Sequence, residues 1–211
     1  MKRIFLLCCF VAFSALAQNF VEIRTIDPTI AVEARYAMSY NFIGRPIAGY
    51  HAEKCFLTPE AASALGKVQG ELRAYGMSLK VYDCYRPQRA VNDFIAWAKD
   101  ESDQKMKKEF YPRVDKRDAF KLGYIAEKSG HTRGSTIDLT IAGLDMGTTY
   151  DFFDELAHTA NPNVSAEARR NRLLLKSVME KFGFRGYEYE WWHFTLANEP
   201  FPDTYFDVEV K

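Results

Sequence analysis

Apolar residues recur at helical spacing in the segment LTPEAASALGKVQGELRAYG, residues 57–76. Thr58 followed by Pro59 is a typical helix start, because the threonine side chain can accept a bond from a free backbone N–H and proline suits the first helical position. Gly76 favours the end of the helix. The apolar face of the expected helix contains Leu65, Val68 and Leu72.

A second helix is expected in PQRAVNDFIAWAKD, residues 87–100, and a third in SAEARRNRLLLKSVMEKFGF, residues 165–184. Ser165 is the expected N-cap of the third helix and Gly183 its end. Its expected apolar stripe consists of Leu173, Leu174, Val178 and Met179. Residues 101–128 are polar, and we expect only a short helix there, near Asp115 to Leu122.

Alternating apolar and polar residues predict strands in four other segments. They are VEIRTI (21–26), MSLKVYDCYRP (77–87), STIDLTI (135–141) and YEYEWWHFTL (187–196). Strands and helices do not alternate regularly along the chain. The pattern therefore predicts an α+β fold, a single compact domain with a mainly antiparallel sheet and flanking helices.

Composition agrees with one soluble globular domain. The chain has 211 residues, of which 47% are hydrophobic and 27% charged, and its formal net charge is zero. Without a basic surplus, nothing in the composition favours binding to nucleic acid or to an anionic membrane.

The N-terminus changes the expected location of the protein. Lys2 and Arg3 precede an apolar run that ends near Ala15-Leu16-Ala17, as in a secretory signal peptide with a small-x-small cleavage site. The run is too short for a comfortable membrane span. We expect residues 1–17 to be removed, leaving residues 18–211 as an exported, periplasmic domain without a membrane anchor.

Cleavage at that site would leave Cys55 and Cys84 as the two cysteines of the mature chain. In an oxidising compartment such a pair more often forms a disulfide than not. The alternative is two separate buried thiols.

The stretch SGHTRGSTIDLT, residues 129–140, together with EYEWWHF, residues 188–194, contains a candidate metal site. Catalytic zinc typically has three protein ligands and an open fourth position, and His131, Asp138 and His193 would supply such a set. His131 lies in the loop before the strand, and Asp138 lies on the polar face of that strand. Taken singly, each has an ordinary alternative as a hydrogen-bonded histidine or a turn carboxylate.

Glu190 is the candidate general base beside this site. Residues three apart on a regular strand face opposite sides, so Glu190 and His193 could not then share a site. The functional interpretation therefore predicts a bulge or helical turn within EWWH. The alternative is that Glu190 is a solvated strand carboxylate.

These motifs, with VYDCYRPQRAV, MGTTYDFFDE and EPFPDTYFDVEVK, resemble the zinc D-alanyl-D-alanine dipeptidases of peptidase family M15, a group that includes the vancomycin-resistance dipeptidases. The resemblance extends from about Phe20 to the C-terminus. It implies a hedgehog/D,D-peptidase-like fold and one Zn²⁺ per chain, bound by His131, Asp138 and His193, with Glu190 as general base.

The resemblance also implies that Arg86 stabilises the oxyanion, and that Ser129 and Asp151 hold the ammonium group of a small dipeptide. A salt bridge to Asp83 or Glu71 is the alternative for Arg86, and capping of a following helix is the alternative for Asp151. The main alternative function is a zinc D,D-carboxypeptidase or endopeptidase that acts on peptidoglycan stem peptides. Because export would separate the enzyme from newly made D-Ala-D-Ala, we expect a role in wall turnover or dipeptide scavenging.

Overall fold

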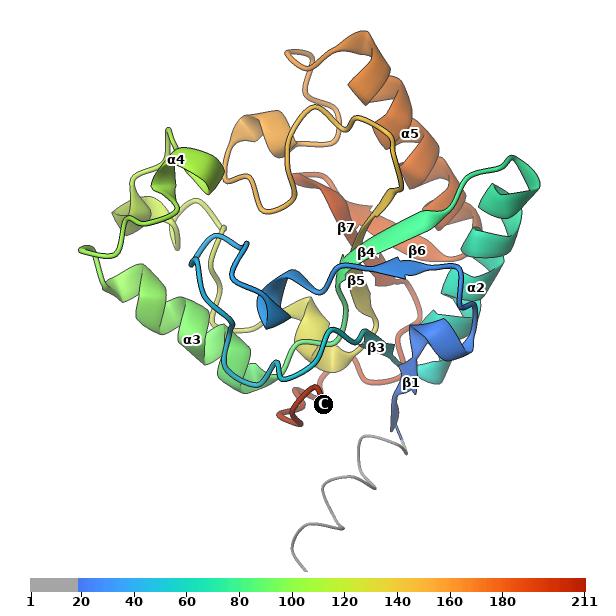
Figure 1. Ribbon diagram of the computed structural model, residues 1–211, viewed down its shortest axis with the longest axis horizontal. Helices are drawn as coiled ribbons and strands as arrows, with labels where there is room; N and C mark the ends of the chain where they lie inside the picture. The colour runs from blue at the N-terminus through green and yellow to red at the C-terminus, as the bar shows by residue number, and fades with distance from the viewer. Residues whose placement is uncertain (1–18) are drawn as a thin grey trace, which may run out of the picture.

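The computed structural model describes residues 19–211, so the expected signal peptide lies outside the described residues. Figure 1 shows the arrangement of the elements. The helices are α2 (Pro59–Ala74), α3 (Gln88–Lys99), α4 (Lys107–Phe110) and α5 (Ala166–Lys181). The strands are β1 (Val21–Glu22), β2 (Ala31–Val32), β3 (Phe56–Leu57), β4 (Leu79–Asp83), β5 (Thr136–Ile141), β6 (Phe184–Tyr187) and β7 (Glu190–Leu196).

Five strands form the central sheet in the order β2-β4-β5-β7-β6. Only the pair β2–β4 is parallel, and the other three pairs are antiparallel. A separate two-stranded ladder joins β1 to β3. The expected α+β class with a mainly antiparallel sheet is confirmed.

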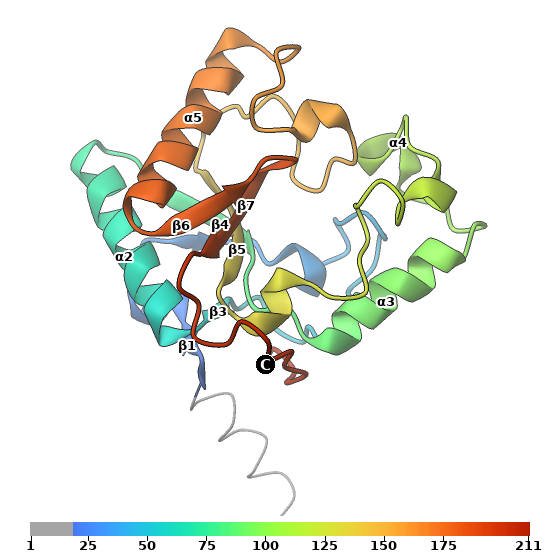
Figure 2. The same cartoon turned by 180° about the vertical axis from the view of Figure 1, so that it is seen from behind.

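Helices α2 and α5 pack against each other, and α5 also packs against β6 and β7 of this sheet. Figure 2 shows α2 and α5 side by side along β6, whereas α3 and α4 lie across the molecule from them. Thr58 and Ser165 cap α2 and α5 as the sequence predicts, since each side chain accepts a bond from the backbone N–H three residues later. All six residues of β5 are buried, so its polar face also lies inside the protein.

The predicted apolar stripe of α5 is partly wrong. Leu173 and Leu174 are 56% and 38% exposed, whereas Arg172 is fully buried. Its guanidinium donates bonds to the backbone carbonyls of Met146 and His158, which satisfies part of the charged group inside the protein. The buried residues of the helix are Ala168, Arg172, Leu175, Val178 and Met179, so the predicted stripe is right for Val178 and Met179.

Two other segments differ from their predicted structure. The expected strand 21–26 is extended only at Val21–Glu22 and continues as a 3-10 turn, Ile23–Thr25. The expected helix near 115–122 is reduced to a 3-10 turn, Lys116–Asp118, where buried Lys116 donates to two backbone carbonyls, those of Asp100 and Asp103. Within residues 19–211, no helix has the length and apolar character needed to cross a membrane.

Two irregularities in the sheet shape the region around Asp138. The β4–β5 register shifts between Val81 and Asp83, so that Asp83 pairs with Asp138. The β6–β7 register shifts after Gly186, which pairs with Phe194, so that the next residue pairs with Glu190. The second shift is the predicted irregularity in EWWH, and it leaves residues 191–193 of β7 without a partner in β6.

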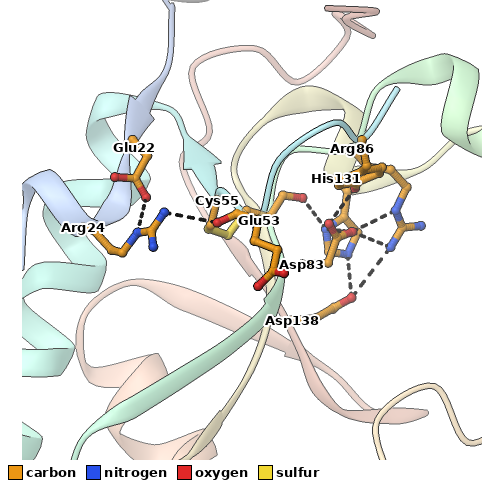
Figure 3. The surroundings of a disulfide bond; sticks show 10 residues. Glu22, Arg24, Glu53, Cys55, Asp83, Arg86, His131 and Asp138 are labelled. Carbon is orange, nitrogen blue, oxygen red and sulfur yellow. Dashed lines mark hydrogen bonds and ion pairs between the residues drawn. A yellow bond between two sulfur atoms is a disulfide. The ribbon is translucent and has the colours of Figure 1, made fainter. Parts of the chain in front are cut away.

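Cys55 and Cys84 form the expected disulfide, with their Cα atoms 5.3 Å apart. Both residues are 2% exposed. The bond links the chain just before β3 to the chain just after β4, and Figure 3 shows it to the left of His131.

Candidate metal centre and active site

Three side chains from two neighbouring strands and the preceding turn converge on one point. Asp138 and His193 face each other in the β5–β7 ladder, and His131 comes from the 3-10 turn Gly130–Arg133 that leads into β5. Gly134 ends this turn in the left-handed conformation, with φ 82°, and a side chain there would collide with the Phe20 ring. One ligand atom from each of the three residues lies within 4.8 Å of the other two.

The spacing of these atoms suits a tetrahedral metal ion. His131 Nε2 lies 3.2 Å from Asp138 Oδ2 and 3.3 Å from His193 Nδ1, and His193 Nδ1 lies 3.1 Å from Asp138 Oδ1. Ligand atoms about 2.0–2.1 Å from a tetrahedral ion are roughly 3.3–3.4 Å from one another. The two imidazoles and one carboxylate are also a ligand set that zinc commonly uses.

The surroundings of His131 and Asp138 support the same assignment. His131 Nδ1 lies 2.7 Å from the Cys84 carbonyl oxygen, so its N–H donates there and Nε2 keeps a free lone pair. Tyr150 donates to Asp138 Oδ2 at 3.0 Å, whereas Asp138 Oδ1 is buried and accepts no hydrogen bond from the described residues. Burial opposes ionisation of Asp138, but His131 and His193 together hold its pKa well below the usual range.

Glu190 shares the site because of the irregularity in β7. Its Oε2 lies 3.4 Å from His193 Nδ1, and the carboxylate borders the same cavity as the three ligands. Burial raises the pKa of Glu190, and the charge of Asp138 adds to the rise, while His193 and Arg86 oppose it. A carboxylate with a raised pKa beside a metal centre is suited to accept and return a proton near neutral pH.

Arg86 is both paired and exposed to the cavity. Its guanidinium donates to Asp83 Oδ2 at 2.9 Å, so the predicted alternative, a salt bridge to Asp83, is present in the structure. The same group lies 3.7 Å from Asp138 Oδ2 and over the rings of Tyr36 and Phe94. The salt bridge therefore holds a permanent cation at the cavity wall. It is compatible with the expected role of Arg86 in stabilising the oxyanion.

Asp151 lies on another wall of the cavity. Its two carboxylate oxygens, 3.2 and 3.0 Å from the Tyr36 hydroxyl, share the proton that this hydroxyl donates. The backbone of Asp151 has φ 59°, a left-handed conformation unusual outside glycine. It does not cap the following helical turn, because Asp154 does so. Burial raises the pKa of Asp151 well above the usual range, and the charge of Asp138 adds to this, so a cation placed beside Asp151 would favour its ionised form.

Ser129 stands at the start of the turn that carries His131. Its Oγ accepts a bond from the His131 backbone N–H at 3.3 Å, and the residue borders the cavity. The structure thus brings all seven predicted site residues to one cavity of about 270 Å³. Drug-sized ligands generally occupy pockets of roughly 300–1,000 Å³, so this cavity suits a small substrate.

Two tyrosines that shape the site are absent from the sequence-based predictions. They are Tyr36 and Tyr150, which connect Asp151 to Asp138 through their hydroxyls, 3.0 Å apart. Because Tyr150 directly precedes Asp151, its position next to a candidate site residue could have indicated its role in the site. Tyr36 lies 115 positions from its partner Asp151, and no local pattern indicates such a contact.

Comparison with known proteins agrees with the geometry. The family model described as D-ala-D-ala dipeptidase, peptidase M15, matches residues 16–211. A D-alanyl-D-alanine dipeptidase of Enterococcus faecium is 42% identical over 85% of this chain and 92% of its own length. Proteins of the same name from Streptomyces coelicolor and Escherichia coli are 40% and 35% identical, covering 91% and 83% of this chain and 98% and 83% of their own lengths. The chain therefore belongs to the peptidase M15 family of D-alanyl-D-alanine dipeptidases.

Proposed function

We propose that this protein hydrolyses D-alanyl-D-alanine and related dipeptides to free amino acids, with one zinc ion per chain. The observation that carries the proposal is the set of groups around one small cavity. A three-residue ligand cluster, a carboxylate with a raised pKa, a fixed arginine and a second buried carboxylate all border it. Each group corresponds to one requirement of dipeptide hydrolysis.

His131, Asp138 and His193 are the residues that would hold the zinc ion. When bound, zinc supplies a Lewis acid that polarises the scissile carbonyl and lowers the pKa of a water molecule. Glu190 accepts the proton of the attacking water and then donates it to the departing amino-acid nitrogen. Its position 3.4 Å from His193 places the carboxylate beside the ligand cluster.

Arg86 stabilises the negative charge that develops on the former carbonyl oxygen. Its guanidinium is held by Asp83 and shielded by the Tyr36 and Phe94 rings, and its side chain is 12% exposed. A fixed cation in a water-poor site interacts more strongly with developing charge than one in bulk solvent. The preformed salt bridge also removes the need for Arg86 to reorganise during the reaction.

Asp151 and Ser129 select the free amino end of the substrate. A buried carboxylate is stabilised when the ammonium group of a dipeptide arrives beside it, and the Ser129 hydroxyl can accept a further hydrogen bond. A longer peptide would instead place a neutral amide beside Asp151 and leave the buried carboxylate without a cationic partner. This difference favours a dipeptidase over an endopeptidase.

The decisive assay compares D-Ala-D-Ala with a stem pentapeptide ending in D-Ala-D-Ala, each with and without a chelator. We expect release of D-alanine from the dipeptide, loss of that activity in the chelator, and its recovery after zinc is added back. Cleavage of the pentapeptide alone would instead identify the protein as a D,D-carboxypeptidase.

Export to the periplasm is the second part of the proposal, with a role in wall turnover or dipeptide scavenging. The signal-like residues 1–17 and the disulfide between Cys55 and Cys84 support it, because such bonds persist in oxidising compartments. Fractionation of the native host should recover a chain that begins near Gln18 outside the cytoplasm. An uncleaved chain in the cytosol would contradict export without affecting the proposed chemistry.

A further inference from the structure

The disulfide is directly connected to the metal-ligand cluster through one backbone group. The carbonyl oxygen of Cys84 accepts the Nδ1–H of His131 at 2.7 Å, and both residues are buried. This bond selects the tautomer whose Nε2 lone pair points at Asp138 and His193. Loss of such a partner behind a ligating histidine typically weakens metal binding about 10- to 100-fold.

The Cys84 carbonyl lies just beyond the end of the β4–β5 ladder, where the Arg86 N–H also donates to the His131 carbonyl at 3.3 Å. The β4–β5 ladder ends at the pair Asp83–Asp138, so Cys84 is the first residue beyond it. The next residue, Tyr85, donates its N–H to the Phe56 carbonyl at 2.9 Å. Phe56 belongs to β3, which is two residues long and pairs only with the equally short β1. A ladder of this length is marginally stable by itself.

The covalent bond is therefore the strongest attachment of this corner. Cys55 directly precedes β3, and its own carbonyl accepts the Ile23 N–H at 3.0 Å. Figure 3 shows the disulfide at the left and His131 at the right, where His131 lies close to Arg86 and Asp138. Displacement of Cys84 would move the carbonyl oxygen that orients His131. It would also shift Arg86, which follows two residues later in the chain.

We propose that the Cys55–Cys84 disulfide is a positioning element of the metal site, so that the chain binds zinc tightly only after the two thiols have been oxidised. The inference rests on the proposed zinc site and export. Oxidation removes two electrons and two protons from the thiols, and the disulfide of an exchange oxidoreductase accepts them by becoming a dithiol. Before export, in a reducing compartment, the thiols remain reduced and the zinc site is weak. Hydrolysis is thereby confined to the compartment in which disulfides form.

The test compares the zinc dissociation constants of residues 18–211 with the native disulfide and of the double variant Cys55→Ala, Cys84→Ala. Competition with a chromophoric chelator gives each constant, and circular dichroism checks that both chains are folded at the assay temperature. We expect binding to be about tenfold weaker or more in the double variant. The control is Leu72→Ala in α2, a buried position outside the cavity that also destabilises the core, and it should keep native zinc affinity. Equal constants for the folded double variant and the native chain would overturn the proposal.

A second measurement needs no variant and covers the case in which the double variant does not fold. Because coupling between two equilibria is reciprocal, zinc must stabilise the disulfide by the same factor by which the disulfide favours zinc. Redox titration in glutathione buffers should show a tenfold shift, about 30 mV, between metal-free and zinc-saturated protein. Identical potentials would overturn the inference. Neither measurement needs turnover, so failure of the dipeptidase assay and failure of this inference are distinguishable.

Discussion

Replacing Glu190 by glutamine tests the assignment of the general base. The change preserves the shape of the side chain but removes its ability to accept a proton. The three ligand atoms of His131, Asp138 and His193 converge without any contribution from Glu190, so the variant should still bind one zinc ion per chain. Metal content and turnover should therefore respond differently to the same substitution.

The size of the loss follows from the other carboxylates at the site. Asp138 is committed to the candidate ligand cluster, Asp83 is paired with Arg86, and Asp151 accepts the Tyr36 hydroxyl proton, shared between its two oxygens. None of these three is free to take over proton transfer from Glu190. We expect the full contribution of a general base to be lost, about 10²- to 10⁴-fold in kcat. This range corresponds to about 2.7–5.4 kcal/mol of activation free energy.

Steady-state release of D-alanine measures kcat and KM, and elemental analysis measures zinc per chain. The matched control is Glu188→Gln, the same substitution at an exposed position two residues earlier, which should leave both quantities unchanged. If Glu190→Gln keeps kcat within tenfold of the native value while zinc-loaded, Glu190 is not the base. A variant that loses zinc as well would show instead that Glu190 contributes to metal binding.

Three other substitutions separate the remaining roles. His193→Ala removes a ligand that lies 3.1 Å from Asp138 Oδ1, so purified protein should contain much less than one zinc per chain by elemental analysis; a full equivalent would exclude a ligand role. Arg86→Lys keeps the charge but not the two-nitrogen contact with Asp83, and kcat should fall by about 10²- to 10³-fold with zinc retained; a change in KM alone would contradict oxyanion stabilisation. Asp151→Asn should lower kcat/KM for D-Ala-D-Ala but not for its N-acetylated form, which lacks the ammonium group; equal losses on both substrates would contradict amine recognition.

Local signals in the chain predicted a large part of the fold. Helix α2 begins after Thr58 and α5 after Ser165, where the side-chain oxygens satisfy free backbone N–H groups, an interaction that depends on neighbouring residues alone. The period-two pattern of residues 135–141 likewise placed Asp138 opposite the apolar face of β5. Even the irregularity in β7 was predictable, because a functional pair three residues apart cannot share one face of a regular strand.

Local sequence patterns could not predict contacts between distant segments of the chain. The apolar pattern of α5 indicated Leu173 and Leu174, which are exposed, whereas Arg172 is buried and donates to two backbone carbonyls. The parallel pairing of β2 with β4 also joins segments whose local patterns do not indicate a partner. In both cases the free energy comes from groups that meet only after the chain has folded.

The candidate site shows the same difference between what local sequence determines and what tertiary contacts determine. The chemical identity of the candidate ligands, the candidate base and the arginine is present in the residues themselves and in the motifs that contain them. The hydroxyl of Tyr36 on Asp151, the pairing of Asp83 with Arg86, and the Cys84 carbonyl behind His131 depend on contacts through space. Residue type determines which chemistry is available, whereas burial and the partners supplied by packing determine protonation and orientation, because both depend on what surrounds a group in the folded protein.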